Sequence, residues 1–324
     1  MLFPFLFLLL FSCGGDGDYI EEIHTLYEES TKIVYDTIYR AGTDSAGNEI
    51  TDTIITERTE TVRNDLKITI DSLNYIFSII GAGSMQGADC YNNLLFQFCD
   101  KFKYAYCYDI TNGNRVALFH FSGAPDGYNY HCNNADFSQT FYNDDDEFPL
   151  VYVSQSSPRH VVVGRIARKK NAFTMDVVQT IVLSGIPSAD VVIDKENGYM
   201  YAYVYNMDKL ILYKYKIPEY NLSDRIVLTK DDILETIDIG HVTYRQGATI
   251  KDGFLYMLDG VPNWGTEVYI KVVNLENGSY SRISFSHNFG FYYEAEDVFF
   301  YNNELYCTTN FGKGVYKVCM SYNR

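Results

Sequence analysis

The sequence is short of basic residues and of tryptophan. Its 324 residues include 26 lysines and arginines against 42 aspartates and glutamates, so the net charge is −16, and there is one tryptophan. Proteins that bind nucleic acids present clustered lysines and arginines, and this deficit argues against a nucleic-acid partner. The one basic cluster, at residues 165–170, is interpreted as the solvated tip of a hairpin.

Common catalytic and metal-binding motifs are also missing. The chain has no GxSxG nucleophile motif, no glycine-rich phosphate cradle and no CxxC pair, and its six histidines are scattered. The acidic run at residues 143–147 lacks the glycine and the final glutamate of an EF-hand loop, so we interpret it as a solvated loop. The sequence therefore contains no recognised catalytic or metal-binding motif.

No apolar run reaches the roughly 20 residues that span a bilayer. The N-terminal apolar run has the length of a signal-peptide core and ends in Leu10-Phe-Ser-Cys13, which resembles a bacterial lipobox. This pattern predicts a signal peptide over residues 1–12 and lipidation of Cys13, which would be the chain's only attachment to a membrane. The alternative is a plain secretory signal in which Cys13 occurs by chance.

Residues 13–63 are predicted to form an acidic linker and a stalk. The segment is rich in threonine, glutamate, aspartate and isoleucine, and its centre at residues 44–48 resembles a turn. We expect it to be helical near residues 20–32 and extended elsewhere. Residues 33–39 and 52–56 could alternatively pair as a hairpin.

Residues 64–324 are predicted to be an all-β repeat domain. Short runs of tyrosine, valine, isoleucine, leucine and phenylalanine recur about every fifty residues and are separated by turn signals. Just ahead of each of these runs, alanine is followed by an oxygen-bearing side chain, and the successive alanines lie 47, 54, 59 and 47 residues apart. The five copies are Gln86-Gly-Ala-Asp89, Asn133-Asn-Ala-Asp136, Pro187-Ser-Ala-Asp190, Gln246-Gly-Ala-Thr249 and Tyr293-Glu-Ala-Glu-Asp297.

This period predicts a five-bladed β-propeller, because each unit carries several strands and lies in the length range of propeller blades. The last unit has only three obvious strands, so a strand at residues 66–70 is expected to complete it and close the ring. A six-bladed propeller, with residues 33–80 as a degenerate blade, is the alternative.

The carboxylates that follow the repeated alanines are the first candidate site. If the five units are equivalent, Asp89, Asp190 and Glu296 could act as acids or bases at one end of the channel, while Asp136 and Asp297 could hold Ca²⁺. The competing interpretation is structural: a repeated aspartate can bond to the backbone of the neighbouring blade.

The second candidate site consists of loop residues that could contact a ligand: His131, Asn133, Arg245 and Trp264. The first three come just before or within predicted inner strands, and such loops face the propeller's funnel. Trp264 follows a second strand, where an exposed ring could stack on a sugar and a buried ring would fill space between blades.

Six cysteines remain after Cys13. Cys99 and Cys107 flank one predicted hairpin turn, and Cys307 and Cys319 flank another, so each pair could form a cross-strand disulfide. We favour buried free thiols.

The lipobox, the acidic stretch Gly14-Gly-Asp-Gly-Asp18 and the Gln-Gly-Ala units together resemble uncharacterised surface lipoproteins of Bacteroidota-type bacteria with propeller bodies. The resemblance implies a protein anchored in the bacterial outer membrane and exposed at the cell surface. Our first hypothesis is a module that binds a glycan or a protein through its loop face. The alternatives are a glycan-cleaving enzyme, as some five-bladed propellers are, and a structural role in envelope assembly.

Overall fold

The computed structural model describes most of the chain beyond residue 26. The described residues are 27–43, 49–65, 67–80, 83–100, 104–126, 131–155, 160–169, 172–186, 189–206, 209–285, 289–310 and 314–323. The predicted signal peptide and Cys13 lie outside them. The chain divides into two compact units, of which one contains residues 68–322 and the other the hairpin of residues 27–65.

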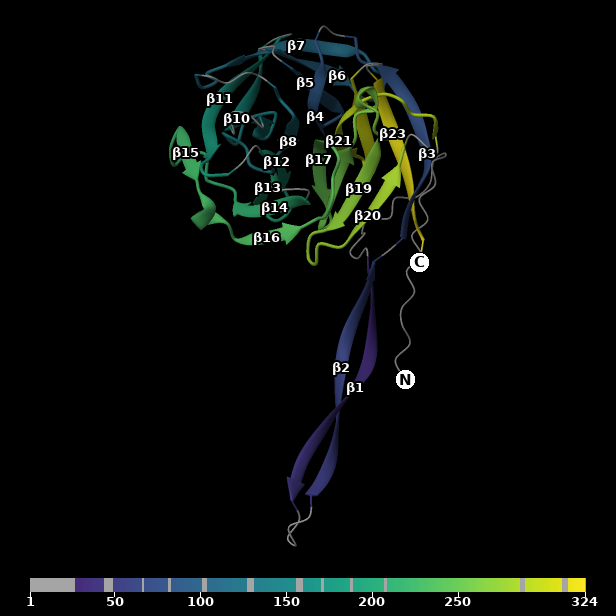
Figure 1. Ribbon diagram of the computed structural model, residues 1–324. Helices are drawn as coiled ribbons and strands as arrows, with labels where there is room; N and C mark the ends of the chain where they lie inside the picture. The colour runs from purple at the N-terminus through teal and green to yellow at the C-terminus, as the bar shows by residue number, and fades with distance from the viewer. Residues whose placement is uncertain are drawn as a thin grey trace. The chain divides into compact units, whose positions relative to one another are not determined.

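The smaller unit is one long antiparallel hairpin (Figure 1). Its strands are β1 (Tyr27–Thr43) and β2 (Glu49–Asp65), paired in register from Tyr27 opposite Asp65 to Thr43 opposite Glu49. Many of its residues are β-branched, which favours a strand over a helix. The helix expected near residues 20–32 is therefore wrong for residues 27–32, and the alternative of a hairpin is what the structure contains.

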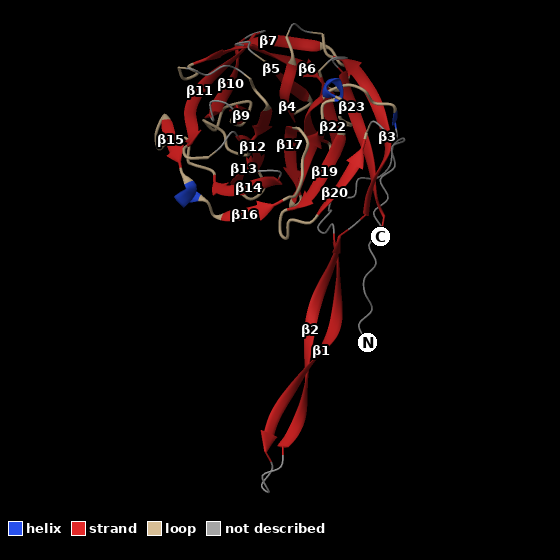
Figure 2. Ribbon diagram, viewed as in Figure 1, coloured by secondary structure: helices blue, strands red, loops and turns tan. Residues whose placement is uncertain are grey.

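The larger unit is all-β, as predicted, and its sheets surround a common centre in a propeller-like arrangement (Figures 1 and 2). The larger unit also contains two 3₁₀ turns, η1 (Lys230–Asp232) and η2 (Pro262–Trp264). No helix in the described ranges is long and apolar enough to cross a membrane.

Three sheets of this unit contain four strands each. The first is formed by β12 (Ala189–Asp194), β13 (Tyr199–Asn206), β14 (Lys209–Lys216) and β16 (Glu235–Asp238). The second is formed by β17 (Arg245–Lys251), β18 (Phe254–Asp259), β19 (Tyr269–Asn274) and β20 (Tyr280–Ser284). The third is formed by β21 (Ala295–Tyr301), β22 (Glu304–Thr309), β23 (Gly314–Asn323) and β3 (Lys67–Ser78).

A fourth, nine-stranded sheet joins two antiparallel halves. Their outer strands pair in parallel, with Phe119 opposite Phe173 and Ser122 opposite Asp176. The first half is β4 (Met85–Tyr91), β5 (Leu94–Cys99), β6 (Tyr104–Asp109) and β7 (Arg115–Ser122). The second is β8 (Asn134–Phe137), β9 (Val151–Gln155), β10 (His160–Lys169) and β11 (Ala172–Leu183), with β15 (Arg225–Leu228) added alongside β11.

The first strands of these groups surround the centre of the unit. In order, β4, β8, β12, β17 and β21 each contact the next, and β21 contacts β4. Strand β3 comes from the start of the domain and pairs with β23, so the last sheet is completed by N-terminal residues, as the segment at residues 66–70 predicted. The ring of inner strands brings together residues more than two hundred positions apart.

Apolar side chains fill the spaces between the sheets, and the phenylalanines cluster most densely. Phe96 lies edge-on to Phe119, Phe137, Phe148 and Phe173 at centroid distances of 5.2 to 6.1 Å. Such edge-to-face pairs stabilise a core beyond the area that they bury. The high aromatic content is thus used mainly in packing.

Five of the described cysteines lie in this packed interior. Cys90, Cys99, Cys107, Cys132 and Cys307 are buried and form no disulfide, which confirms that interpretation for these five. The cross-strand disulfides considered from the sequence are not formed, because Cys107 lies opposite Phe96 and Cys307 lies opposite Tyr316 in their ladders.

Candidate functional site

The repeated alanines do not all occupy equivalent positions. Counting back from the last residue pair of each hairpin, Ala88 stands three residues before Tyr91, and Ala248 stands three residues before Lys251. The same count in β12 and β21 reaches Val191 and Val298 rather than Ala189 and Ala295. The expectation of five equivalent units is therefore wrong in these two strands.

Bulges also interrupt three of the inner strands. The ladders shift between Met85 and Ala88, between Arg245 and Ala248, and between Ala295 and Asp297, whereas the ladder of β12 with β13 is regular. A bulge adds a residue that has no partner in the ladder.

Asp89 and Asp136 each accept a backbone N–H group of the next inner strand. Asp89 Oδ2 accepts the backbone N–H of Phe137 at 2.7 Å, and its Oδ1 accepts that of Cys90. Asp136 Oδ2 accepts the N–H of Ile193 at 3.1 Å. The two carboxylates therefore tie β4 to β8 and β8 to β12.

Asp297 also links two inner strands, although it occupies a different position in its own strand. Its Oδ2 accepts the N–H of Ala88 at 2.6 Å, and its Oδ1 accepts that of Val298 at 2.9 Å. The carboxylate fits because Gly247 faces it: a Cβ on that glycine would lie 2.0 Å from Asp297 Oδ1. The glycine of the repeated Gln-Gly-Ala pattern is thus required for space.

Asn134 completes the filling of the centre. Its Oδ1 accepts the N–H of Ala248 at 2.7 Å, and its Nδ2 donates to Val191 O at 3.0 Å and to Asp136 Oδ2 at 2.7 Å. Asn134, Asp136 and Asp297 are all buried. The middle of the ring is therefore occupied by bonded polar side chains.

The electrostatics of the buried carboxylates reflect their removal from water. Burial raises the pKa of Asp89, Asp136 and Asp297, and neighbouring carboxylates raise the pKa of the latter two further. Lys195 and two backbone N–H groups oppose the rise in the pKa of Asp89. In the described part of the chain no three acidic, histidine or cysteine side chains are arranged to hold a metal ion, so the Ca²⁺ site considered for Asp136 and Asp297 is not found.

Asp190 is paired with Arg245. The Nε of Arg245 lies 2.8 Å from Asp190 Oδ2, and both side chains are almost fully buried. The guanidinium lies over the ring of Tyr205 at 4.8 Å. This pair joins the starts of β12 and β17, so both residues hold the ring together.

Glu296 stands in the bulge of β21, five residues before the end of the strand, where β4 and β17 carry Gln86 and Gln246. It is 2% exposed, its Oε2 accepts a hydrogen bond from the Nε2 of Gln86 at 3.1 Å, and its Oε1 has no hydrogen-bond partner among the described residues. Burial and then the charge of Glu294 raise the pKa of Glu296 well above its ordinary value. A protonated Glu296 can donate to Glu294.

His131 and Asn133 precede β8. The Nδ1 of His131 lies 2.9 Å from Asp100 Oδ1, and the side chain is partly exposed. Asn133 is half-buried, and its backbone N–H donates to His131 O at 3.0 Å. The tyrosines expected beside them, at positions 128 and 130, lie outside the described residues.

Trp264 is the most exposed of the predicted ligand residues. Its side chain is 66% exposed on η2 and lies edge-on to Tyr244, which is 37% exposed, at a centroid distance of 4.9 Å. The loop is closed by Thr266, whose Oγ1 accepts the N–H of Val261 at 2.7 Å and donates to its carbonyl. Of the two roles considered for Trp264, the structure contains the exposed one.

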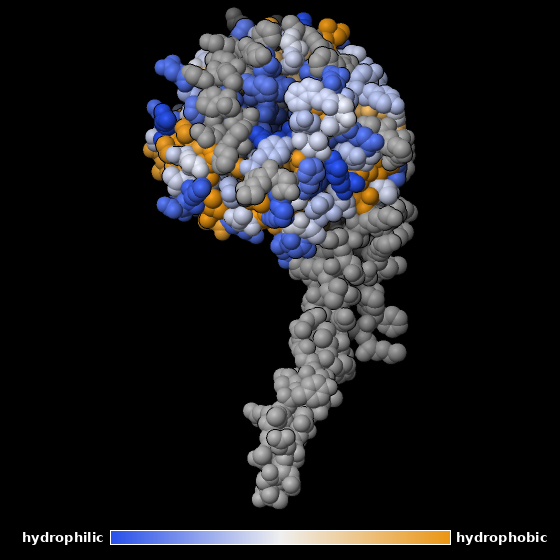
Figure 3. All heavy atoms as spheres, in the orientation of Figure 1, coloured by the Kyte–Doolittle hydropathy of each residue, from blue (hydrophilic) through white to orange (hydrophobic). Residues whose placement is uncertain are grey.

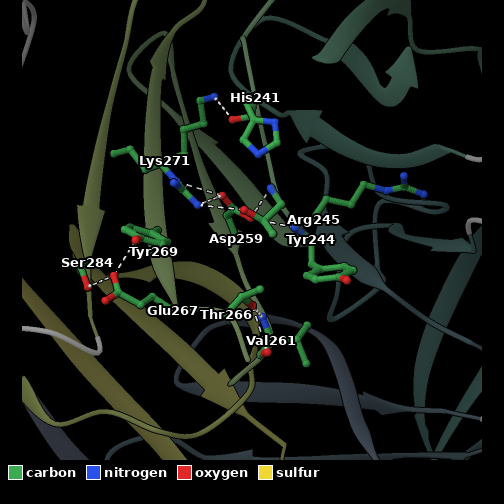
Figure 4. A network of polar contacts seen from close by, with 12 residues as sticks. His241, Tyr244, Arg245, Asp259, Val261, Thr266, Glu267, Tyr269, Lys271 and Ser284 are labelled. Atoms are coloured by element: carbon green, nitrogen blue, oxygen red, sulfur yellow. Dashed lines mark hydrogen bonds and ion pairs between the residues drawn. The ribbon is translucent and has the colours of Figure 1, made fainter. Parts of the chain in front are cut away.

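A polar network supports this aromatic pair (Figure 4). The buried carboxylate of Asp259 accepts the N–H groups of Thr243 and Tyr244 at 2.8 and 2.9 Å, and Arg282 Nε donates to it at 3.0 Å. Nearby, Lys271 Nζ donates to the carbonyl of His241 at 3.0 Å, and burial lowers the pKa of Lys271 to about 8. Asp259 thereby fixes the backbone that carries Tyr244.

Two further exposed tyrosines, Tyr292 and Tyr293, precede Glu294, whose Oε1 accepts the Nε2 of Gln246 at 3.4 Å. Trp264 lies between β18 and β19, at the same end of the sheet as the start of β17. We call Tyr244, Trp264, Tyr292 and Tyr293 the aromatic face. Sequence reasoning found only Trp264, because the exposure of the tyrosines depends on packing.

The surface view gives the surroundings of the ring. A hollow opens near the middle of the face shown in Figure 3, and hydrophilic residues line it. Such a hollow agrees with an inner ring whose side chains are largely polar.

No protein-family model matches this chain, and no curated protein matches it. Among solved structures, the glutaminyl cyclase of Myxococcus xanthus is 9% identical and matches 80% of this chain and 98% of its own, with a TM-score of 0.49. A PQQ-bound aldose sugar dehydrogenase from Streptomyces coelicolor is 10% identical over 79% of this chain and 99% of its own, at 0.46. The tail fibre of Staphylococcus aureus phage P68 is 11% identical over 78% of this chain and 52% of its own, at 0.50. At these identities a likeness concerns the fold alone.

Proposed function

We propose that this protein is a glycan-binding β-propeller with five blades. The nine-stranded sheet counts as two blades, because each half begins with its own inner strand and the halves meet only through β7 and β11. The hairpin of residues 27–65 forms a sheet of its own and supplies no sixth blade.

The observation that carries the proposal is the exposed, supported pair of Trp264 and Tyr244. Large aromatic side chains are unfavourable in contact with water, so free energy is gained when a ligand covers them. Sugars present C–H faces that stack on such rings and hydroxyls that bond to neighbouring polar groups, which Glu294 and Gln246 supply. Because Asp259 and Thr266 hold the pair in place, little side-chain entropy is lost on binding.

Binding is better supported than cleavage. Asp89, Asp136 and Asp297 each accept backbone N–H groups, and Asp190 is engaged by Arg245. Carboxylates that hydrolyse glycosides instead face the substrate across a gap of several ångströms. The ring carboxylates serve the fold, and the ligand is bound on the aromatic face.

The experiment uses the single tryptophan as a reporter. A glycan array identifies ligands, and a titration then follows Trp264 fluorescence, which stacking should quench or shift. Calorimetry on Trp264→Ala and Tyr244→Ala should show affinity at least about tenfold weaker, since each removes a contact at the centre of the site. Tyr75→Ala, which removes an exposed tyrosine of β3, is the control. The proposal is refuted if no glycan changes the fluorescence of Trp264, or if the glycans that change it bind as tightly to Trp264→Ala.

We further propose that Cys13 carries lipid and anchors the protein in the bacterial outer membrane, with the hairpin of residues 27–65 as part of a stalk. The lipobox-like residues 10–13 and the acidic residues after them support this location. Mass spectrometry should find an acylated N-terminal peptide, and Cys13→Ser should move the protein out of the membrane fraction. A Cys13→Ser protein that still sediments with membranes would contradict it.

A further inference from the structure

A pocket with a volume of about 490 Å³ lies away from the aromatic face. It is lined by Tyr152 of β9 and by residues of three further segments: the loop after β8, the turn between β12 and β13, and the segment after β14. Because β12 and β13 are antiparallel, their turn lies at the opposite end of the sheet from Asp190. Asp190 and Arg245 mark the aromatic end, so the pocket opens at the other end of the ring.

Lys195 lines this pocket, and its ammonium group can donate hydrogen bonds to a ligand. Its Nζ lies 4.0 Å from Asp89 Oδ2, beyond hydrogen-bond length, and it makes no hydrogen bond to any residue that the structure describes. Its side chain is 30% exposed, and the charge of Asp89 raises its pKa, so the ammonium stays protonated. Three N–H groups are therefore open to oxygen atoms of a ligand.

Tyr152 supplies a second donor. The residue is buried on β9 and lines the pocket, yet its hydroxyl bonds to nothing within the described ranges. Burial raises the pKa of Tyr152 to about 12, so the hydroxyl keeps its proton at neutral pH. A ligand rich in oxygen atoms would supply hydrogen-bond acceptors for the ammonium of Lys195 and the phenol of Tyr152.

The remaining lining residues restrict the ligand further. Glu196 and Glu219 add carboxylate acceptors, and Ile217, Pro218 and the ring of Tyr220 add an apolar wall. Tyr220 is held by its hydroxyl, which donates to Tyr142 O at 3.1 Å. Two carboxylates in the lining, on a protein of net charge −16, disfavour anions.

We propose that this pocket is a second ligand site, distinct from the aromatic face, which binds a neutral monosaccharide or disaccharide. Hydroxyls accept from Lys195 and Tyr152 and donate to Glu196 and Glu219, while the C–H face of the sugar packs on Ile217, Pro218 and Tyr220. The volume lies within the ~300–1,000 Å³ range of small-molecule sites. A sugar is the ligand that uses donors, acceptors and wall together.

The test is calorimetric titration of the whole protein with neutral hexoses, their disaccharides and free amino acids. A neutral sugar should bind, and Tyr152→Phe should weaken it roughly threefold to tenfold by removing one hydrogen bond while keeping the ring. Glu219→Gln, on an exposed residue, should weaken it by a similar factor. Lys195 is left intact in these variants because it balances the charge of Asp89.

Trp264→Ala is the matched control, since it alters the aromatic face and should leave the pocket affinity unchanged. In the same way, sugar binding in the pocket should leave Trp264 fluorescence unchanged. The proposal is overturned if no neutral sugar binds, if amino acids bind in preference, or if Tyr152→Phe and Glu219→Gln bind as the wild type does.

Discussion

At the scale of single residues, the interior of the ring is built from polar groups that would be unfavourable there alone. Asp89, Asp136 and Asp297 are buried carboxylates, and each is offset by backbone N–H groups from its own or the neighbouring strand. Buried polar groups are tolerated when they are hydrogen-bonded, and they then specify which strands meet. Aspartate therefore acts here as a connector between strands.

Gly247→Ala tests how tightly this interior is filled. A Cβ would lie 2.0 Å from Asp297 Oδ1 and 2.7 Å from Asp297 Cα, so backbone must move, and we expect a loss of about 3 kcal/mol in the free energy of unfolding. Gly253→Ala is the control: it has open space but a φ of 76°, and should cost about 1 kcal/mol. Urea denaturation measures both, and equal losses would contradict the steric argument.

Glu296→Gln tests the raised pKa of that carboxyl. Because the folded pKa lies above the ordinary value of 4.5, the stability that the protonated group contributes is complete below about pH 4.5 and is lost as pH rises through the folded pKa. Glutamine, which β4 and β17 carry at this position, cannot ionise, so the variant should match the wild type at pH 4.

At pH 8 we expect Glu296→Gln to be more stable than the wild type, because glutamine avoids the ionisation that burial disfavours. Urea midpoints at both pH values provide the measurement, with Asp144→Asn, an exposed change, as the control. A variant that loses stability equally at pH 4 and pH 8 would show that Glu296 is not protonated in the folded protein.

At the scale of elements, the inner strands are short and are stabilised by side chains that cross between them. Strand β8 has four residues, yet Asn134 at its start bonds to the backbone of both β12 and β17. Bulges in β4, β17 and β21 turn residues such as Gln86, Gln246 and Glu296 out of the ladder. The inner ring therefore depends on irregular backbone and on contacts distant in sequence.

Asn134→Ala should destabilise the protein by about 2 to 4 kcal/mol, because it leaves the N–H of Ala248 and the carbonyl of Val191 buried without these partners. Asn277→Ala removes a hydrogen bond of 2.9 Å in an exposed turn and should cost less than about 1 kcal/mol. Thermal and urea unfolding compare the two. A cost for Asn134→Ala as small as for Asn277→Ala would refute its bridging role.

At the scale of the whole molecule, the sequence allows the all-β class, the period of about fifty residues and the closing strand to be predicted, because strand patterns and turns are local. The positions of Ala189 and Ala295 could not be predicted, since the composition of a strand does not report its register. The Lys195 pocket was missed because its residues come from four segments between positions 138 and 221. Trp264 was found as a candidate, but its exposure depends on packing that no local pattern reports.

Closure by β3 can be tested by truncation. A chain beginning at residue 66 keeps β3 and should unfold at about the temperature of the full protein. A chain beginning at residue 80 loses the buried side chains of Ile68 and Ile70 and exposes the edge of β23, so its midpoint should fall by roughly 10 °C or more.

A synthetic peptide of residues 66–79 offers the matching rescue. Added to the chain that begins at residue 80, it should pair with β23 and restore most of the lost midpoint, whereas a peptide of the same composition in scrambled order should not. The exposed edge of β23 should cause the truncated chain to self-associate, which size-exclusion chromatography detects, and the peptide should suppress this association. If both truncated chains unfold at the same temperature, β3 does not close the ring, and the last sheet is stable with three strands.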